Sequence, residues 1–308
     1  MILIADSGST KTAWCLLGKD TAHRQTIYTQ GINPFHQNEE DICAILRHEL
    51  YPLIADQSNH INHIHFYGAG CTKEKSPIVA DALRNAINST ARISVESDML
   101  GAARGVCGHQ KGIVCILGTG SNSCYYDGRN LHQDIPALGY ILGDEGSGAY
   151  IGRRLVGDIL KRQLPEDIQQ QFFEETKETQ ENIIQKVYRA PFPNRYLASL
   201  SPFCHRHRTH PSIHTLLLDC FSQFFIRNIL PTQQQHPILS PIQQQHSPTF
   251  QTQPLPPISL PVHFVGSIAY HYQSELTEVA HTYGIQLGTI AQSPLEGLAE
   301  YHITELLS

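Results

Sequence analysis

Short apolar runs separated by small polar segments dominate the first third of the chain and predict strands. An apolar run over residues 1–6 ends at Asp6, a polar segment follows over 7–11, and a second apolar run over 12–17 completes a predicted hairpin. Further strands are predicted over 23–29, 61–69, 91–96, 111–117, 123–126 and 260–265.

Apolar residues spaced three or four positions apart predict helices between and after these strands. The predicted helices cover residues 39–54, 77–88, 98–107, 147–162, 181–188, 213–229, 269–283 and 294–307. The mixture of strands and helices indicates an α/β fold, and a chain of 308 residues is long enough for two domains.

The arrangement of predicted elements occurs twice. A strand, a small polar turn and a second strand begin near residue 1 and again about 110 residues later, near residue 111. Because the two segments share architecture and not sequence, we interpret them as an internal duplication of structure.

Residues 232–257 differ from the rest of the chain. They contain Gln-Gln-Gln-His twice, among many prolines. Such a composition cannot bury an apolar core, so we expect a disordered or loosely held insertion. A proline-rich docking segment is the alternative.

The overall charge argues against a nucleic-acid partner. The formal net charge is −6, whereas a protein that neutralises many phosphates needs a basic face. No stretch approaches the ~20 apolar residues that span a bilayer, and no basic, apolar leader is present, so we expect a cytoplasmic protein without membrane contact.

The eight cysteines form no C-x-x-C pair, and we interpret them as reduced core thiols in place of disulfides.

The segment between the first two strands has the composition of a phosphate-binding turn. Its residues after Asp6 are Ser7, Gly8, Ser9, Thr10, Lys11 and Thr12. Glycine lets backbone N–H groups approach phosphate oxygens, hydroxyls and a lysine add donors, and Asp6 could hold Mg²⁺ through water. An ordinary hairpin turn is the alternative, and the P-loop pattern is absent.

A second polar turn follows the strand predicted over 111–117. It consists of Gly118, Thr119, Gly120, Ser121 and Asn122. It lacks the third glycine of a dinucleotide fingerprint and leads into a strand, so we interpret it as a second phosphate hairpin. Two such hairpins that face one another could clamp one polyphosphate between two domains.

Three acidic or metal-binding patterns have competing interpretations. Asp98 lies between a strand and a small-residue helix, where Ser97 or Asp98 could simply cap the helix. Asp144 lies between Gly143 and Gly146, which suggests close approach of a ligand, although a solvated turn is the alternative. The Cys and His residues over 204–210 match no structural zinc spacing, so we expect a solvated helix or loop there.

Five motifs in this order resemble the superfamily of sugar kinases, actin and heat-shock ATPases. They are Asp6-Ser-Gly-Ser-Thr-Lys-Thr12, Glu96-Ser-Asp-Met-Leu-Gly-Ala-Ala103, Gly118-Thr-Gly-Ser-Asn122, Leu142-Gly-Asp-Glu-Gly-Ser147 and Phe264-Val-Gly-Ser267. More narrowly, the chain resembles an N-acetylglucosamine kinase-like member of the BadF/BadG/BcrA/BcrD ATPase family, which also contains activator ATPases. The resemblance covers nearly the whole chain outside about 231–259.

This resemblance implies two actin-like (ribonuclease H-like) domains with a nucleotide cleft between them. The first domain would cover 1–110, with the C-terminal helix over 293–308 packed back on it, and the second 111–292. It further implies ATP and Mg²⁺ as cofactors, a sugar substrate and a homodimer.

The resemblance also implies roles for single residues. Asp98 matches the base that takes the proton of the sugar hydroxyl, and the turns over 6–12 and 118–120 match the two phosphate loops. Gly266 and Ser267 match the turn that contacts adenosine. Residues that match sugar contacts are Asn33, Ser121, Asn122 and Asp144.

The implied activity is transfer of phosphate from ATP to an amino sugar, N-acetylglucosamine first among them, at the 6-hydroxyl. Two alternatives stay open: an activator ATPase of a dehydratase or reductase, and a non-catalytic sugar-binding member.

The sequence also departs from the family at two places. The first turn reads Asp-Ser-Gly-Ser-Thr where Asp-Gly-Gly-Gly-Thr is commoner, and Leu138 stands where the animal enzymes have a tryptophan.

Overall fold

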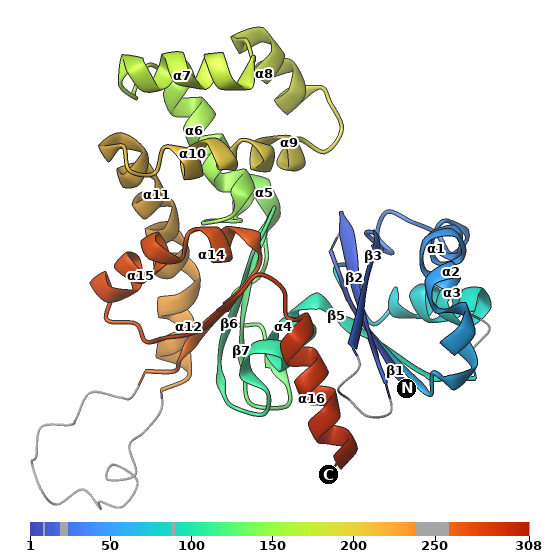
Figure 1. Cartoon of the computed structure of the whole chain (residues 1–308). Coiled ribbons are helices and arrows are strands. Elements are labelled where there is room, and N and C mark those ends of the chain that lie inside the picture. Colours follow the sequence, from blue (N-terminus) through green and yellow to red (C-terminus); the bar gives the residue numbers. More distant parts are fainter. Residues whose placement is uncertain (9, 19–23, 88–89, 238–258, 308) are drawn as a thin grey trace, which may run out of the picture. The chain divides into compact units, whose positions relative to one another are not determined.

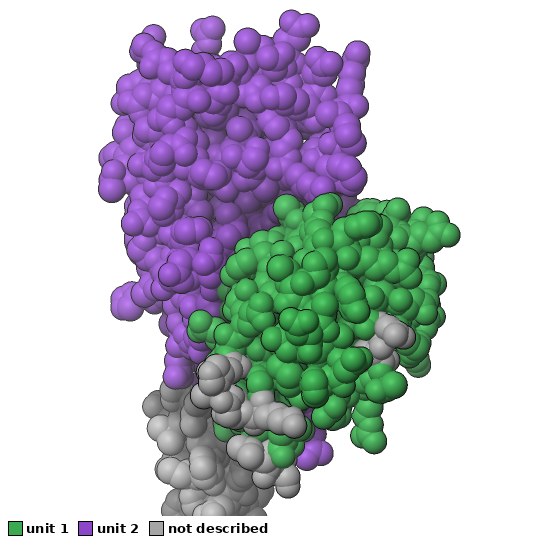
Figure 2. Space-filling view, turned by 45° about the vertical axis from the view of Figure 1, so that its right-hand side comes forward, with its two compact units in different colours: residues 1–110, 293–308 green, residues 111–292 purple. Residues whose placement is uncertain are grey.

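Two five-stranded sheets, one in each of two units, form the framework of the chain (Figure 1). The computed structural model describes residues 1–8, 10–18, 24–87, 90–237 and 259–307. Residues 1–110 and 293–308 make unit 1, and residues 111–292 make unit 2; Figure 2 colours them separately.

The sheet of unit 1 has the strand order β3-β2-β1-β4-β5. Strands β1 and β2 form the predicted antiparallel hairpin, and β1, β4 and β5 are parallel. The strands are β1 (Ile2–Ser7), β2 (Lys11–Leu17), β3 (Arg24–Gln30), β4 (His63–Gly68) and β5 (Arg92–Ser97). The helical segments are α1 (Glu39–Ile45), η1 (Leu46–Leu50), α2 (Tyr51–Ile54), η2 (Ala55–His60), α3 (Ser76–Ile87), α4 (Asp98–Cys107) and α16 (Leu295–Leu307).

The sheet of unit 2 has the strand order β10-β9-β6-β7-β8. Its strands are β6 (Gly112–Leu117), β7 (Ser121–Tyr126), β8 (Leu131–His132), β9 (Val262–Val265) and β10 (Leu287–Ala291). Its helices up to residue 199 are α5 (Gly139–Leu142), α6 (Gly148–Leu160), α7 (Glu166–Thr176), α8 (Gln180–Tyr188) and α9 (Pro193–Ser199). The later ones are α10 (Ser201–Arg206), α11 (Pro211–Phe224), η3 (Phe225–Ile229), α12 (Leu230–Gln235), α14 (Ser267–His271) and α15 (Gln273–Thr282).

The two sheets share one topology. In each, the first strand pairs antiparallel with the second and parallel with a later strand, and a third antiparallel strand closes one edge. The α/β fold and the internal duplication predicted from the sequence are therefore confirmed.

Several elements differ from the sequence prediction. The helix expected over 39–54 contains a π-helical turn at Leu46–Leu50, and the helix expected over 269–283 is divided at Tyr272. Helices α7 and α9 and strand β10 were not predicted, and α10 overlaps the segment over 204–210 that was expected to be a helix or loop. Most of the insertion expected over 231–259 lies outside the described residues; its first part belongs to α12.

Helices α4 and α16 lie side by side in unit 1 and approach each other through glycines (Figure 1). A Cβ on Gly297 would lie 1.8 Å from the carbonyl oxygen of Gly105, and a Cβ on Gly105 would lie 2.6 Å from the Cβ of Pro294. No larger residue fits at either position unless the backbones separate. This contact lets Leu295, Leu298 and Ala299 join the core on one face of the sheet.

Aromatic and histidine side chains connect α16 to strand β4. The Tyr67 hydroxyl lies 2.9 Å from His302 Nε2 and accepts a hydrogen bond from Arg104. The His302 ring stacks on His65 with centroids 3.8 Å apart, and His63 stacks on His65 at 6.0 Å. Burial first, then the neighbouring histidine and Arg104, lowers the pKa of His302 to about 3 and of His65 to about 4.

Within the described part of the chain, no helix has both the length and the apolar character needed to cross a membrane.

Because the glycine contact admits no side chain, Gly297→Ala should lower the melting temperature. Overpacking of this kind costs about 1–3 kcal/mol, which corresponds to a decrease of several degrees in thermal unfolding followed by circular dichroism. Gly157→Ala is the matched control, since a Cβ there has no atom within 4 Å and alanine favours a helix. Equal melting of the Gly297→Ala variant and the parent would show that the close approach is not needed.

The histidine stack should make stability depend on pH. Unfolded histidines bind protons below about pH 6.5, whereas folded His65 and His302 do so only near pH 3–4, so unfolding takes up protons in between. The free energy of unfolding should therefore fall as the pH is lowered from 7 to 5, by up to about 1.4 kcal/mol per pH unit for each histidine. Urea unfolding of His302→Gln, which keeps an acceptor for Tyr67, should show a smaller decrease than the parent; an equal decrease would contradict this origin.

Candidate functional site

The carboxyl ends of three parallel strands meet at one edge of the unit 1 sheet. Ser7 pairs with Gly68, and Gly68 pairs with Ser97, so β1, β4 and β5 end side by side. Asp6 lies just before this edge and Asp98 just after it. Two carboxylates far apart in sequence are thereby brought into electrostatic contact.

The first polar turn is held together by the buried hydroxyl of Ser7. This hydroxyl lies 2.6 Å from the Thr12 hydroxyl, donates to the carbonyl of Ile32 and accepts from the N–H of Ile32. Ser7 stands where a glycine is commoner in sequences of the resembling family. Its hydrogen bonds to Ile32 link the turn to the loop after β3. The Ser7 hydroxyl is thus engaged within the folded chain, whereas Gly8, Thr10 and Lys11 are exposed.

The predicted phosphate residue Ser9 lies outside the described residues. Lys11 is exposed, and its Nζ lies 4.7 Å from the centre of the Tyr28 ring.

Asp6 is oriented by a residue from the other end of the chain. Ser293, which precedes α16, donates its hydroxyl to Asp6 Oδ2 at 2.9 Å. Burial and the Asp98 carboxylate raise the pKa of Asp6 to about 6, although Ser293 and Lys11 oppose that increase. The negative charge of Asp6 is poorly compensated. A divalent cation bound there would offset both the cost of burying that charge and its repulsion from Asp98, so Asp6 fits a cation site.

Asp98 begins helix α4, but Ser97 caps it. The Ser97 hydroxyl accepts from the N–H of Leu100, and Asp98 Oδ1 accepts from the N–H of Met99. Burial raises the pKa of Asp98, and its backbone hydrogen bonds act against that. Ser97, and not Asp98, is therefore the N-cap of α4, so capping does not occupy the Asp98 carboxylate, which is available as a base.

Asn33 lies in a tightly bonded loop on the same unit. Its Oδ1 accepts from the N–H of Phe35, and its N–H donates to the side chain of Gln37. Gly70, with φ of +77°, packs so closely that a Cβ would lie 2.3 Å from Asn33 Oδ1. The loop is thus fixed in the folded chain, and neighbouring Ile32 ties it to Ser7.

In unit 2 the second turn closes onto the start of α6. The carbonyls of Gly118 and Thr119 accept from the N–H groups of Gly148 and Ala149. Gly266, with φ of +118°, lies against Leu117, where a Cβ would be 2.3 Å from the carbonyl oxygen. The turns at 118–120 and 266–267 therefore lie together at the ends of β6 and β9.

Asp144 packs directly on the second turn. Its Oδ1 accepts from the N–H of Ser121 at 3.2 Å, and a Cβ on Gly120 would lie 2.8 Å from its Oδ2. Its φ of +57° is unusual for a residue other than glycine. Burial raises the pKa of Asp144, and Arg153 works in the opposite direction. Asn122 is engaged locally, where its Oδ1 accepts from Ser123 and Gln133.

The predicted site residues thus form two sets. Unit 1 holds Asp6, Ser7, Gly8, Thr10, Lys11, Asn33 and Asp98. Unit 2 holds Gly118, Thr119, Gly120, Ser121, Asn122, Asp144, Gly266 and Ser267.

Two residues that the sequence did not single out also belong here. Ser293 contacts Asp6 across 287 positions of sequence, and Arg153 lies near Asp144 from helix α6. Ser293-Pro before a helical pattern is a local signal for a helix start, but nothing in it indicates Asp6.

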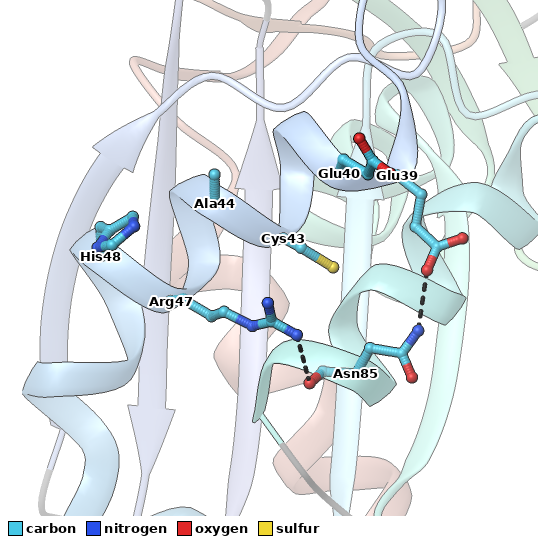
Figure 3. A pocket seen from close by; sticks show the side chains of 7 residues that line it. All are labelled: Glu39, Glu40, Cys43, Ala44, Arg47, His48 and Asn85. Atoms are coloured by element: carbon cyan, nitrogen blue, oxygen red, sulfur yellow. Dashed lines mark hydrogen bonds between the residues drawn. The ribbon is translucent and has the colours of Figure 1, made fainter.

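A cavity of about 440 Å³ lies elsewhere in unit 1, between helices α1, η1 and α3 (Figure 3). Two hydrogen bonds cross it: Arg47 donates to the backbone carbonyl of Asn85, and the Asn85 side chain donates to Glu39. None of the candidate site residues lines it.

The Cys and His residues over 204–210 have structural partners. Cys204 is fully buried in the core, so the expectation of a solvated segment is wrong at that position. His207 pairs with Glu175, and His210 caps α11. Among the described residues no group of three or more His, Cys, Asp or Glu side chains is placed to hold a metal ion.

Known proteins resemble this chain over its whole length. A proposed N-acetylglucosamine kinase from Porphyromonas gingivalis has 44% identity, with 99% of this chain and 100% of that chain covered and a TM-score of 0.87. A proposed N-acetylglucosamine kinase from Chromobacterium violaceum has 16% identity, 97% and 98% coverage and a TM-score of 0.67.

A ROK family glucokinase from Streptomyces griseus, in complex with glucose and AMPPNP, has 13% identity, 97% coverage of both chains and a TM-score of 0.52. The last two similarities show the fold alone. No protein-family model matches the chain, and no curated protein matches it. At 44% identity over the full length, the chain belongs to the family of the Porphyromonas gingivalis protein and has the actin-like sugar kinase fold.

Proposed function

We propose that this chain is an ATP-dependent kinase that phosphorylates an amino sugar, with N-acetylglucosamine as the first acceptor to test and its 6-hydroxyl as the site of transfer. The observation that carries the proposal is Asp98, a half-buried carboxylate beside the first polar turn and Asp6. The similarity to the Porphyromonas gingivalis protein supports the choice of sugar.

Asp98 has the properties of a general base. A sugar hydroxyl is a weak nucleophile, and a carboxylate within ~3 Å can accept its proton as the phosphoryl group transfers. Because burial raises the pKa of Asp98, its carboxylate binds a proton more readily than an exposed one would.

The other residues would bind and orient the two substrates. The turns over 7–11 and 118–120 would hold phosphates through donors other than the N–H groups of Gly8 and Gly118, which donate to the carbonyls of Lys11 and Gly120. Gly266 with Ser267 would contact adenosine. Asp6 would hold Mg²⁺, which neutralises phosphate charge when bound. Residues proposed to contact the sugar are Asn33, Ser121, Asn122 and Asp144.

The cysteines give no support to an activator ATPase. Such proteins ligate an iron–sulfur cluster between subunits, which requires cysteine at the surface. All eight cysteines of this chain are buried.

A screen of ATP consumption across hexoses, hexosamines and their N-acetylated forms tests the proposal directly. We expect turnover with at least one amino sugar and a phosphorylated product by mass spectrometry. No sugar-dependent consumption of ATP across the set would contradict it.

Asp98→Asn should reduce kcat by about 10²- to 10⁴-fold, because the amide cannot accept the hydroxyl proton. ATP binding, measured by calorimetry, should persist. Asp81→Asn, at an exposed carboxylate of α3, is the control and should retain full turnover. A variant lacking the Asp98 carboxylate that works at the parent rate would remove Asp98 from the mechanism.

The rate should also fall on the acid side near pH 6. Asp6 takes up a proton as the pH decreases through its raised pKa, and a protonated carboxyl no longer binds a cation. Since the Ser293 hydroxyl lowers that pKa, Ser293→Ala should shift the acid limb of kcat/KM to higher pH. Ser274→Ala, which removes a hydroxyl bonded to Glu275, should leave the limb in place, and an unshifted limb in Ser293→Ala would contradict the role of Ser293.

A further inference from the structure

Residues 138–143, here called the strap, lead directly into Asp144. They contain α5, and none of its four residues, all of them described, is buried. Leu138, Ile141 and Leu142 are 53%, 67% and 72% exposed, and only Tyr140 packs on the core of unit 2. Burial of apolar surface therefore contributes little to the position of the strap.

Arg153 of helix α6 supplies a polar anchor for the strap. Its Nη1 donates to the carbonyl of Tyr140 at 3.0 Å and to the carbonyl of Ile141 at 3.3 Å. Its guanidinium lies over the ring of Tyr150, one helical turn earlier, at 4.9 Å from the ring centre. Hydrogen bonds from a charged donor contribute more than neutral ones, and the aromatic contact holds the donor in place.

The end of the strap determines where the Asp144 carboxylate lies. Gly143 donates its N–H to the carbonyl of Gly139, and the next residue, Asp144, takes the left-handed conformation. Such a conformation persists in a non-glycine residue only when the surrounding structure fixes it. The strap on one side and Ser147, which donates to the carbonyl of Asp144, on the other provide this support.

We propose that Arg153 is a positioning residue for the acceptor site: it fixes the strap and, through it, the Asp144 carboxylate that binds the sugar. This inference rests on the proposed role of Asp144 and adds a residue that does not itself contact substrate. The charges that face Asp144 are Glu145 and Arg153, and Glu145 is in turn paired with Arg227 at 3.6 Å.

The adjacent Arg154 offers a matched control on the same helix. Its Nη1 pairs with Asp219 at 2.7 Å and its Nη2 lies 3.9 Å from Asp158, and both of these partners lie outside the strap. Arg153→Met and Arg154→Met each remove one guanidinium from α6, and only the first removes the strap anchor.

The test compares the two variants in steady-state kinetics with ATP and N-acetylglucosamine. In Arg153→Met we expect the acceptor KM to rise about 10-fold, the ATP KM to stay within about 2-fold, and Arg153→Lys to recover part of the loss. Arg154→Met should leave the acceptor KM unchanged. Equal effects of the two methionine variants, or equal increases in both KM values, would overturn the proposal.

Two further measurements separate this inference from the proposed function. Hydrogen exchange of the peptide over 138–146 should be faster in Arg153→Met than in Arg154→Met, and equal exchange overturns the anchoring role whether or not a sugar is turned over. Asp144→Asn should raise the acceptor KM; if it does not, the proposed role of Asp144 fails. If Asp144→Asn raises the acceptor KM and Arg153→Met does not, only the inference about Arg153 fails.

Discussion

The contact between Gly105 and Gly297 is the constraint on which the candidate site residues of unit 1 depend. Because neither glycine has a side chain, α16 can lie directly against α4. Helix α4 starts with Asp98, and Ser293 stands just before α16, so one crossing of two helices sets the positions of two groups that face Asp6. Residues from both ends of the chain thereby converge at the carboxyl edge of one sheet.

The sequence predicted the strand ends that the candidate residues follow. Polar residues directly after apolar runs mark strand ends, and this signal located both turns and the strand end before Asp98, while only the resemblance implied a role for Asp98. Ser293 and Arg153 could not be found this way, because their contacts depend on packing between elements distant in the chain. Helix α7 was missed because it buries only two apolar side chains, and edge strand β10 because no residue in it is fully buried.

Three carboxylates of the candidate site are held at a cost to stability. Burial raises the pKa of Asp6, Asp98 and Asp144, which means that folding disfavours their charged forms at neutral pH. Asp144 adds an unfavourable backbone conformation. Poorly compensated charge and strained backbone at the ends of strands are typical of sites that gain their missing partners from a ligand.

The division of the chain between the two units has a consequence for how the protein folds during synthesis. Unit 2 is continuous, whereas unit 1 needs residues 293–308 to complete its core, which includes Leu295, Leu298 and Ala299. The strands β1 and β2 are therefore synthesised before α16, and one apolar face of their sheet stays uncovered until α16 is made. Translation that stops before residue 293 would leave unit 1 without part of its core, although unit 2 would already be complete.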